Sequence, residues 1–295
     1  MSITRRGALQ LCLLSWAAAH SLAADASSAA EVLAELERLN GGRLGVAVLN
    51  TGNGQLTGHR QDERFALCST FKLLLAAAVL QQVDAGRLQL RQWVPLGPGD
   101  RVAHAPVAGP AIAQGGMPLE ALAKAMQTTS DNVAANALLR LMGGPASLTA
   151  WLRAQGDEMT RIDRWEPDMN RVMAGDLRDT TSPAAMARST ARMVLGETLS
   201  NRSRARLQGW LVETKTGLKR LRAELPPGWR AGDKTGTGQG PGYPDRINDV
   251  AVLWPPAGRA PLVVAAYYEA PVATEGPMRM QDEAVLAAVG RWVSR

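Results

Sequence analysis

The segment CSTFKLLLAAAVL, residues 68–80, decides how the rest of this chain has to fold. It is apolar on nearly every side, which is typical of a helix buried all round. It nevertheless carries a lysine, Lys72, one turn after Ser69, so that both side chains share a helix face. Because an uncompensated buried charge is very unfavourable, Lys72 must be paired, deprotonated or both. The segment therefore predicts a buried helix with an amine and a hydroxyl in contact at its start, where free N–H groups can stabilise negative charge.

Strand patterns lie on both sides of this helix, near the two ends of the chain. Residues 31–39 have helical periodicity and stop at Asn40-Gly41-Gly42, and the runs 44–49 and 55–57 flank an NTGNG turn, which predicts a hairpin. Residues 228–268 return to strand patterns separated by turn clusters, and a last helix is expected at about 277–294. Strands at both ends predict one sheet assembled from the two termini.

The middle of the chain is helical instead. We expect an α/β fold of two domains, in which an antiparallel sheet flanked by terminal helices comes from residues 25–66 and 213–295, and an all-α domain, residues 67–212, is inserted. The crevice between them is the expected place for a binding site. Turns with Gly and Pro separate helical patterns near residues 69–84, 119–127, 132–142, 145–155, 183–195 and 201–212.

The composition excludes some classes of protein. With 295 residues, of which 46% are hydrophobic, the chain can bury a large core. Its net charge of +6 is not organised into dense Lys/Arg runs with interleaved aromatic residues, and only 4% of the residues are aromatic. We therefore expect a generally basic surface and no nucleic-acid partner.

The first 24 residues have the pattern of an export signal. Arg5 and Arg6 precede a modestly apolar stretch that ends in small residues and contains no acid, which indicates a signal peptide, residues 1–24, cleaved near Ala23 or Ala24. Both twin-arginine export and ordinary Sec export fit this pattern. Because no later apolar run reaches the ~18 residues of a membrane span, we expect a soluble, periplasmic mature protein without a membrane anchor.

Cysteine and histidine are too few for several kinds of site. Cys12 falls in the expected signal, which leaves Cys68 without a disulfide partner and implies that its thiol is buried. His59 and His104 form no ligand-spaced cluster with it, so we expect no metal and no cofactor. A Ser-His-Asp triad would have to use one of these two histidines, and no Gly-x-Ser-x-Gly elbow surrounds a serine. Lysine or carboxylate chemistry would then have to activate Ser69.

Three short motifs follow one another along the chain: Ser69-x-x-Lys72, Ser130-Asp131-Asn132 and Lys234-Thr235-Gly236. Each alone has an ordinary explanation: a helix start with a snorkelling lysine, an N-cap cluster, and a strand that runs into a glycine turn. Together, in this order and spacing, they resemble the active-serine penicillin-recognising family. Glu166-x-x-x-Asn170, in the irregular stretch 161–179, narrows the resemblance to the class A β-lactamases.

This resemblance implies a β-lactamase that hydrolyses the β-lactam amide of penicillins and cephalosporins through a serine acyl-enzyme and so confers antibiotic resistance. It also implies the two-domain serine β-lactamase and penicillin-binding-protein fold, and a monomer whose partner is the small β-lactam substrate. Ser69 is then the nucleophile, the N–H groups of Ser69 and Thr237 form the oxyanion hole, and Ser130 relays a proton to the leaving nitrogen. Glu166 and Asn170 activate the hydrolytic water, whereas the base for acylation, Lys72 or Glu166, stays open. The residues expected to bind the substrate's polar groups are Asn132, Lys234, Thr235, Gly236, Thr237, Arg220 and, at the entrance, His104.

The stretch around Glu166 has two further features of the family. Arg164 and Asp179 resemble the pair that pins the two ends of this loop. Glu166-Pro167 is a candidate for a cis peptide bond, which an X-Pro sequence permits at low cost. The loop has to be rigid to hold the hydrolytic water, and the pair of Arg164 and Asp179 is expected to pin its ends.

Substrate range is less well defined by the resemblance. Cys68, Thr237 and Arg220 resemble those of members that act on cephalosporins and, in some cases, carbapenems. Glycine at position 238 rules out the disulfide to Cys68 that several carbapenemases have, which counts against carbapenem hydrolysis. The segment 239–247 is also a few residues longer than is usual in the family, and this could reshape the edge of the cleft.

Two alternative functions share most of these motifs. A penicillin-binding DD-peptidase has the same nucleophile but deacylates β-lactams poorly, and a catalytically inactive β-lactam sensor would only bind them. The pair Glu166 and Asn170 argues against both. The expected absence of a membrane anchor argues further against the DD-peptidase.

Overall fold

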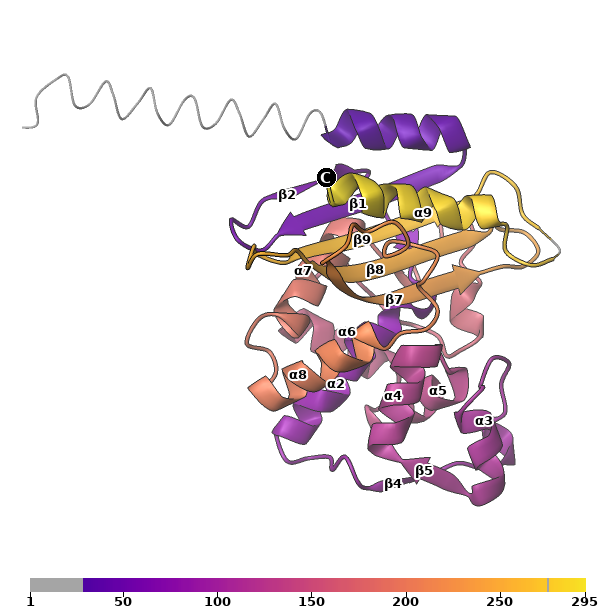
Figure 1. Ribbon diagram of the computed structural model, residues 1–295. Helices are drawn as coiled ribbons and strands as arrows, with labels where there is room; N and C mark the ends of the chain where they lie inside the picture. The colour runs from indigo at the N-terminus through magenta and orange to yellow at the C-terminus, as the bar shows by residue number, and fades with distance from the viewer. Residues whose placement is uncertain (1–28, 275) are drawn as a thin grey trace, which may run out of the picture.

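The computed structural model describes residues 29–274 and 276–295, so the expected signal peptide lies outside the described residues. A five-stranded antiparallel sheet forms one side of the molecule, with strand order β2-β1-β9-β8-β7 (Figure 1). Strand β1 pairs with β9 from Arg43 opposite Glu269 to Asn50 opposite Leu262, which joins the two ends of the chain as predicted. The strands are β1 (Arg43–Asn50), β2 (Leu56–His59), β7 (Arg230–Gly238), β8 (Arg246–Trp254) and β9 (Leu262–Glu269).

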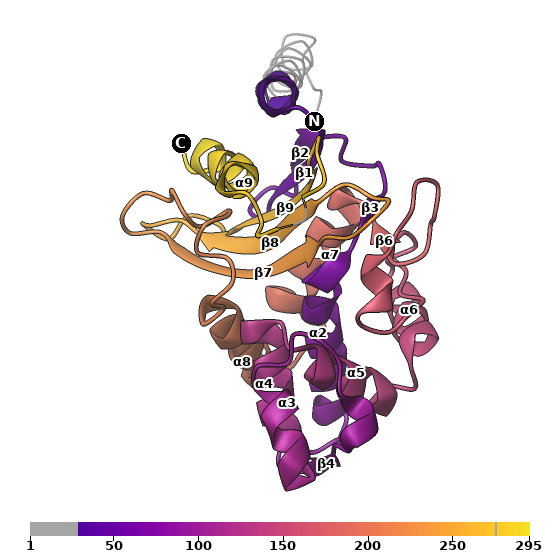
Figure 2. The same cartoon turned by 90° about the vertical axis from the view of Figure 1, so that its right-hand side faces the viewer.

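Each face of this sheet is covered by helices, which gives three layers. A helix over residues 29–40 and α9 (Met280–Val293) lie on one face, and α7 (Pro183–Val194) lies against the other (Figures 1 and 2). The side-chain alternation of a strand supplies both cores. In β9, Val264, Ala266 and Tyr268 pack beneath the terminal helices, whereas Val263, Ala265 and Tyr267 pack toward the helical part of the chain.

The apolar segment quoted first is the centre of the helical part. A 3-10 turn, η1 (Cys68–Thr70), leads into α2 (Phe71–Asp84), whose residues from Phe71 to Leu80 are all buried, Lys72 included. The prediction of a fully buried helix is thus confirmed, because other helices surround α2. These are α4 (Leu119–Thr129), α5 (Asn132–Leu141), α6 (Pro145–Ala154), α7 and α8 (Asn201–Val212).

Short elements were the ones that sequence patterns did not predict. The pairs β3 (Phe65–Ala66) with β6 (Thr180–Thr181) and β4 (Trp93–Pro95) with β5 (Gly116–Pro118) are too short to show a period of two. The other short elements are α3 (Ala108–Ala111), η2 (Pro98–Asp100), η3 (Ile112–Gln114) and η4 (Asp168–Asn170). The domain boundaries at residues 66/67 and 212/213 stay a prediction, since α7 and α8 pack directly on the sheet.

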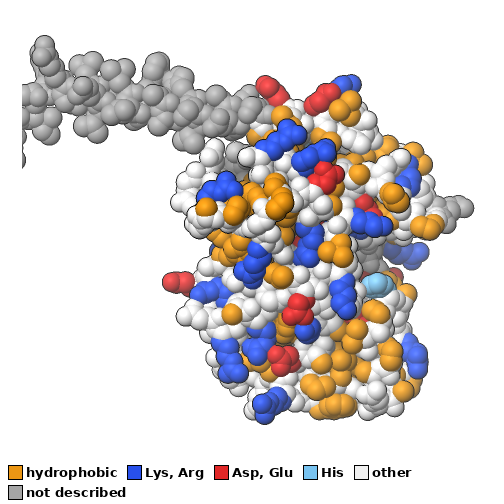
Figure 3. Space-filling model, viewed as in Figure 1, with side chains coloured by type: hydrophobic (Ala, Val, Ile, Leu, Met, Phe, Trp, Pro, Cys, Tyr) orange, Lys and Arg blue, Asp and Glu red, His pale blue; other side chains and the backbone are white. Residues whose placement is uncertain are grey.

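Charged side chains of both signs are mixed on the surface. On the face shown in Figure 3, Lys and Arg side chains are scattered and are interspersed with acidic ones. Among the described residues, no helix combines the length and apolarity required to cross a membrane.

Candidate active site

Ser69 lies where the edge of the sheet meets the start of α2. It is half-buried in η1, and β7 runs directly against this turn. Two glycines of β7 permit the approach: a Cβ built on Gly236 would lie 2.9 Å from Leu67 O, and one on Gly238 would lie 3.0 Å from Cys68 Sγ. The glycines flanking Thr237 therefore let the backbone of β7 lie close to the turn that holds Ser69.

The outer edge of β7 offers backbone groups to this site. It is an edge strand that pairs only with β8 in the described sheet. Asp233 O accepts from Thr214 Oγ1 at 2.7 Å and Thr235 O accepts from Lys234 Nζ at 2.7 Å, so these residues direct their polar backbone groups away from β8. With the period of two of a strand, the N–H of Thr237 points to the same side. It faces the turn that holds Ser69.

Lys72 is the centre of the site's hydrogen bonds. The motif spacing predicted its contact with Ser69, and the structure confirms it. An ammonium has three N–H donors, yet more than three oxygens surround this one, so its proton positions are shared within a buried cluster. The distances from Lys72 Nζ are 2.9 Å to Ser69 Oγ, 2.9 Å to Ser130 O, 2.5 Å to Asn132 Oδ1 and 2.9 Å to Glu166 Oε1.

Burial sets the electrostatics of both lysines. The side chains of Lys72 and Glu166 are fully buried against each other. Burial lowers the pKa of Lys72, and the neighbouring Glu166 charge opposes this shift. Burial, followed by the charge of Lys72, lowers the pKa of Lys234 to about 7. Each lysine is thus easier to deprotonate than a solvated one, which suits an amine that exchanges protons with a hydroxyl.

The three residues of the Ser130-Asp131-Asn132 motif lie at the junction of α4 and α5 and make different contacts. Asp131 is the N-cap of α5 and accepts from Ala134 N at 2.9 Å, so the N-cap explanation is right for this residue. Ser130 has a left-handed backbone conformation, with φ at 60°. Its Oγ accepts from Lys234 Nζ at 3.1 Å and lies 3.4 Å from Lys72 Nζ. Ser130 therefore bridges the two lysines. The side-chain amide of Asn132 donates to Ala103 O at 2.9 Å.

The loop that carries Glu166 brings its carboxyl directly to Ser69. Ser69 Oγ donates to Glu166 Oε1 at 3.2 Å, while Asn170 Nδ2 donates to Glu166 Oε2 at 2.7 Å. The expected cis peptide is present between Glu166 and Pro167. Asn136 Nδ2 donates to Glu166 O at 2.9 Å, and Asn136 Oδ1 accepts from Glu166 N at 3.0 Å. The backbone and both carboxyl oxygens of Glu166 are thus held.

The ends of this loop are joined as predicted. Arg164 Nε lies 2.5 Å from the buried Asp179 Oδ2. The other carboxyl oxygen of Asp179 accepts from Asp163 N at 2.7 Å and from Arg164 N at 3.1 Å. Burial is the largest influence on this carboxyl and raises its pKa, against the effect of these hydrogen bonds. The ion pair closes the loop at its base.

The residues expected to receive a carboxylate line the same edge of β7. Thr235 Oγ1 lies 2.6 Å from Thr216 Oγ1, next to the buried Lys234. Arg220 is only 4% exposed and is anchored beneath β7, where it donates to Gly236 O and Asn248 O, both at 2.9 Å. It reaches the exposed Thr237 through Nη2, which donates to Thr237 Oγ1 at 2.8 Å. Arg220 thus supplies charge and orientation from behind Thr237.

His104 lies apart from this hydrogen-bond cluster. It is exposed in a loop at φ 58°, and its Nε2 lies 3.0 Å from Thr129 O. Its backbone O accepts from Asn132 N at 2.9 Å, which places it beside the site rather than in it. A contact between His104 and substrate therefore stays a prediction.

Some residues of the site had no motif to reveal them. Asn136 follows Asn132 by one helical turn on the same face of α5, and this spacing is a signal that could have been used. Thr216 has no such signal, because only the fold brings it to β7. Cys68 is free and buried, as expected, and burial raises the pKa of its thiol to about 12. In residues 29–274 and 276–295, no three His, Cys, Asp or Glu side chains are grouped to hold a metal ion.

Lys72 and Glu166 thus contact the Ser69 hydroxyl, and Ser130 links Lys72 to Lys234, with no histidine in this cluster of described residues. Residues 28–295 match the family model of the beta-lactamase enzyme family. The beta-lactamase L2 of Stenotrophomonas maltophilia is 46% identical over 292 residues, 97% of this chain and 93% of that protein. The beta-lactamase CTX-M-25 of Escherichia coli is 42% identical over 273 residues, 92% of this chain and 90% of that protein. A solved structure of an ancestral (GNCA) class A beta-lactamase superimposes with a TM-score of 0.84 at 52% identity, covering 90% of this chain and 98% of that one. This chain therefore belongs to the class A β-lactamases, which are serine hydrolases.

Proposed function

We propose that this enzyme hydrolyses penicillins and cephalosporins and that Ser69 attacks the β-lactam carbonyl. The proton of Ser69 can pass to Glu166 Oε1, to which Ser69 Oγ donates at 3.2 Å, or to Lys72 Nζ, 2.9 Å away, once that amine is deprotonated. The N–H groups of Ser69 and Thr237 stabilise the oxyanion, and one such donor is typically worth about 3 kcal/mol. Ser130, between the two lysines, passes a proton to the departing ring nitrogen. This opens the amide and leaves an ester on Ser69.

The observation that favours hydrolysis over simple acylation is the pair formed by Glu166 and Asn170. Asn170 Oδ1 is buried and makes no hydrogen bond in the described part of the chain, while its Nδ2 is fixed on Glu166 Oε2 at 2.7 Å. An unused buried acceptor is unfavourable unless it receives a donor. A water that donates to Asn170 Oδ1 and to Glu166 would satisfy it and would be aimed at the ester. The DD-peptidase and sensor alternatives would not require this pair.

Substrate recognition follows from the rest of the crevice. The substrate's amide is bound by Asn132, with His104 at the entrance, and its carboxylate is bound by Lys234, Thr235 and Thr237, oriented by Arg220 beneath the strand. Hydrolysis of these drugs in the periplasm, after cleavage of residues 1–24, would confer resistance. We further propose that the mature enzyme is a monomer whose residues 67–212 form the all-α domain.

Turnover by the purified mature enzyme tests this function. The wild-type enzyme should hydrolyse many equivalents of benzylpenicillin and of an early cephalosporin. The loss of β-lactam absorbance measures this turnover. Ser69→Ala should lower the rate to background, with Ser147→Ala, an exposed serine of α6, as the control that keeps it. Fewer than two turnovers per wild-type enzyme would refute the hydrolase, and normal turnover by Ser69→Ala would refute the nucleophile.

A further inference from the structure

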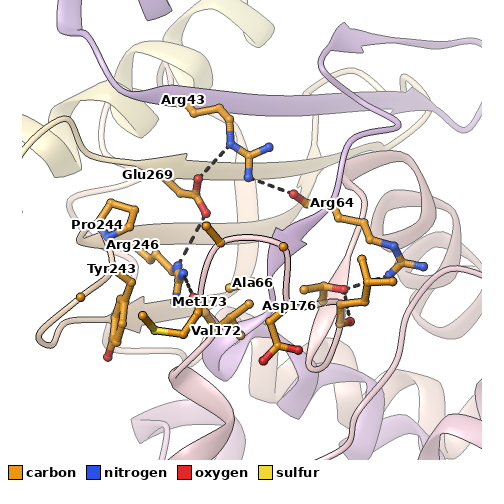
Figure 4. A pocket seen from close by; sticks show the side chains of 15 residues that line it. Arg43, Arg64, Ala66, Val172, Met173, Asp176, Tyr243, Pro244, Arg246 and Glu269 are labelled. Carbon is orange, nitrogen blue, oxygen red and sulfur yellow. Dashed lines mark hydrogen bonds and ion pairs between the residues drawn. The ribbon is translucent and has the colours of Figure 1, made fainter.

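The turn between β7 and β8 packs against the loop that carries Glu166. Residues 239–245 of this turn face residues 170–177, the second half of that loop, which we term the descending limb (Figure 4). Gly242 lies close to it: at φ 86°, a Cβ built there would be 3.1 Å from Met173 Cε. The two segments are therefore in contact, although sequence patterns assign neither of them to a helix or strand.

Arg246, the first residue of β8, connects them. It is 3% exposed, and its Nη1 donates to Asn170 O at 3.0 Å. Its Nη2 donates to Val172 O. The planar fork of an arginine thus holds two carbonyls of the descending limb at once.

The guanidinium of Arg246 is itself fixed on its other sides. Its carbon lies 4.5 Å from the centre of the Tyr243 ring, and the Tyr243 hydroxyl donates to Gln239 O at 2.8 Å. Its Nε lies 3.6 Å from Glu269 Oε1, and the other oxygen of Glu269 lies 2.9 Å from Arg43 Nε, as the dashed lines in Figure 4 show. Stacking and charge pairing leave the fork little freedom.

Packing holds the descending limb mainly at Val172, which is 4% exposed and is buried with Ala66 and Cys68. A cavity of about 430 Å³ lies behind it, lined among others by Ala66, Val172 and Leu177. Met173 and Leu177 are 48% and 54% exposed. Arg164 ties the limb to its own loop, through Arg171 O at 2.9 Å and Asp176 at 3.5 Å. The hydrogen bonds from Arg246 add a direct connection between the limb and β8 of the sheet.

We propose that Arg246, stacked on Tyr243, is a positioning residue for deacylation. It fixes the backbone of Asn170, whose Nδ2 holds Glu166 Oε2 at 2.7 Å and whose buried, unpartnered Oδ1 is the acceptor assigned above to the hydrolytic water. This inference rests on the proposed function. The backbone of Arg246 pairs with Gly238 of β7, but its guanidinium is directed to the descending limb and not to Ser69. Loss of the guanidinium should therefore affect acylation less than deacylation.

The test separates the two steps by single-turnover kinetics with a chromogenic cephalosporin. Arg246→Met should slow deacylation about tenfold or more and change the acylation rate less than threefold. Arg246→Lys, which keeps the charge and can still donate, should recover part of the loss. Arg230→Met is the matched control, because Arg230 also stacks on an aromatic ring, at 4.2 Å from that of Trp254, but lies at the far end of β7. It should leave both rates within twofold.

Tyr243→Leu gives an independent reading if Arg246→Met does not fold. It removes the stacked ring, keeps both hydrogen bonds of Arg246, and should slow deacylation about two- to fivefold, with longer persistence of the acyl adduct by intact mass. Equal slowing of acylation and deacylation in the folded variants, or deacylation within twofold of wild type in both, would overturn the proposal. Absence of turnover in the wild type would refute the proposed function instead.

Discussion

Gly238→Cys tests how closely β7 lies against the turn that holds Ser69. A Cβ at position 238 would lie 3.0 Å from Cys68 Sγ, and this is about the separation of a Cβ from its partner's sulfur across a disulfide of normal S–S length, ~2.04 Å. The backbone of Gly238 has no positive φ, so an L-residue fits there. The variant should therefore form a disulfide without backbone movement.

The expected stabilisation follows from the loop that this bond closes. The bond would close a loop of about 170 residues. For this length the chain-entropy model predicts a stabilisation of about 5 kcal/mol, whereas measured disulfides typically contribute about 2–4 kcal/mol. For a chain of this size, about 2–4 °C of melting temperature corresponds to each kcal/mol, so Tm should rise by roughly 4–16 °C. Because burial raises the pKa of the Cys68 thiol to about 12, few molecules carry the reactive thiolate, and an oxidising glutathione buffer is required during folding.

Melting with and without reductant, together with thiol titration, measures this effect. The oxidised variant should show no titratable thiol after unfolding and should lose its gain in Tm on reduction. Gly238→Ser is the control, because it introduces the same crowding against Cys68 without a covalent bond and should melt at or below wild type. Two titratable thiols after oxidation, or equal Tm values in both redox states, would show that β7 and η1 are not in the described contact.

Two further perturbations address the loop and the lysines. Asn136→Ala removes both hydrogen bonds to the backbone of Glu166 and should cost about 1–3 kcal/mol in urea unfolding, with slower deacylation; wild-type values for both would contradict the description of the loop. Since the pKa of Lys234 is lowered to about 7, the free enzyme loses this charge as pH rises through 7, and KM for a carboxylate substrate should rise above pH 7, at most tenfold per unit. Lys234→Arg should abolish that rise because arginine stays protonated, and a wild-type KM that is constant to pH 9 would contradict the lowered pKa. Between about pH 7 and 10 the unfolded chain binds more protons at Lys234 than the folded chain does. The unfavourable effect of burying the charged lysine on folding should therefore diminish as pH rises through this range.

The structural features that depend only on local residue spacing and composition were predictable from the sequence. The contact between Ser69 and Lys72 needs only one helical turn, and the burial of α2 needs only its apolar composition. The sheet from both ends of the chain followed from strand patterns at each terminus. The convergence of Ser130, Lys234 and Glu166 on that turn came from resemblance to a family, since no periodicity relates these segments.

Contacts made by irregular segments were not predictable in this way. Arg246 follows a turn of no regular pattern, and its hydrogen bonds to Asn170 and Val172 depend on the path of two loops at once. Buried arginine at the start of a strand has no signal of its own in the sequence. Such contacts form only when the fold is complete, and here they connect the sheet to the loop that carries Glu166.

The intact mass of Glu166→Ala during incubation with benzylpenicillin tests most directly whether this carboxyl separates hydrolysis from acylation. We predict that the variant gains the mass of one penicillin and keeps it for hours, whereas wild type returns to its own mass as soon as substrate is exhausted and Ser69→Ala never gains it. An adduct that Glu166→Ala clears as fast as wild type would contradict the assignment of deacylation to Glu166.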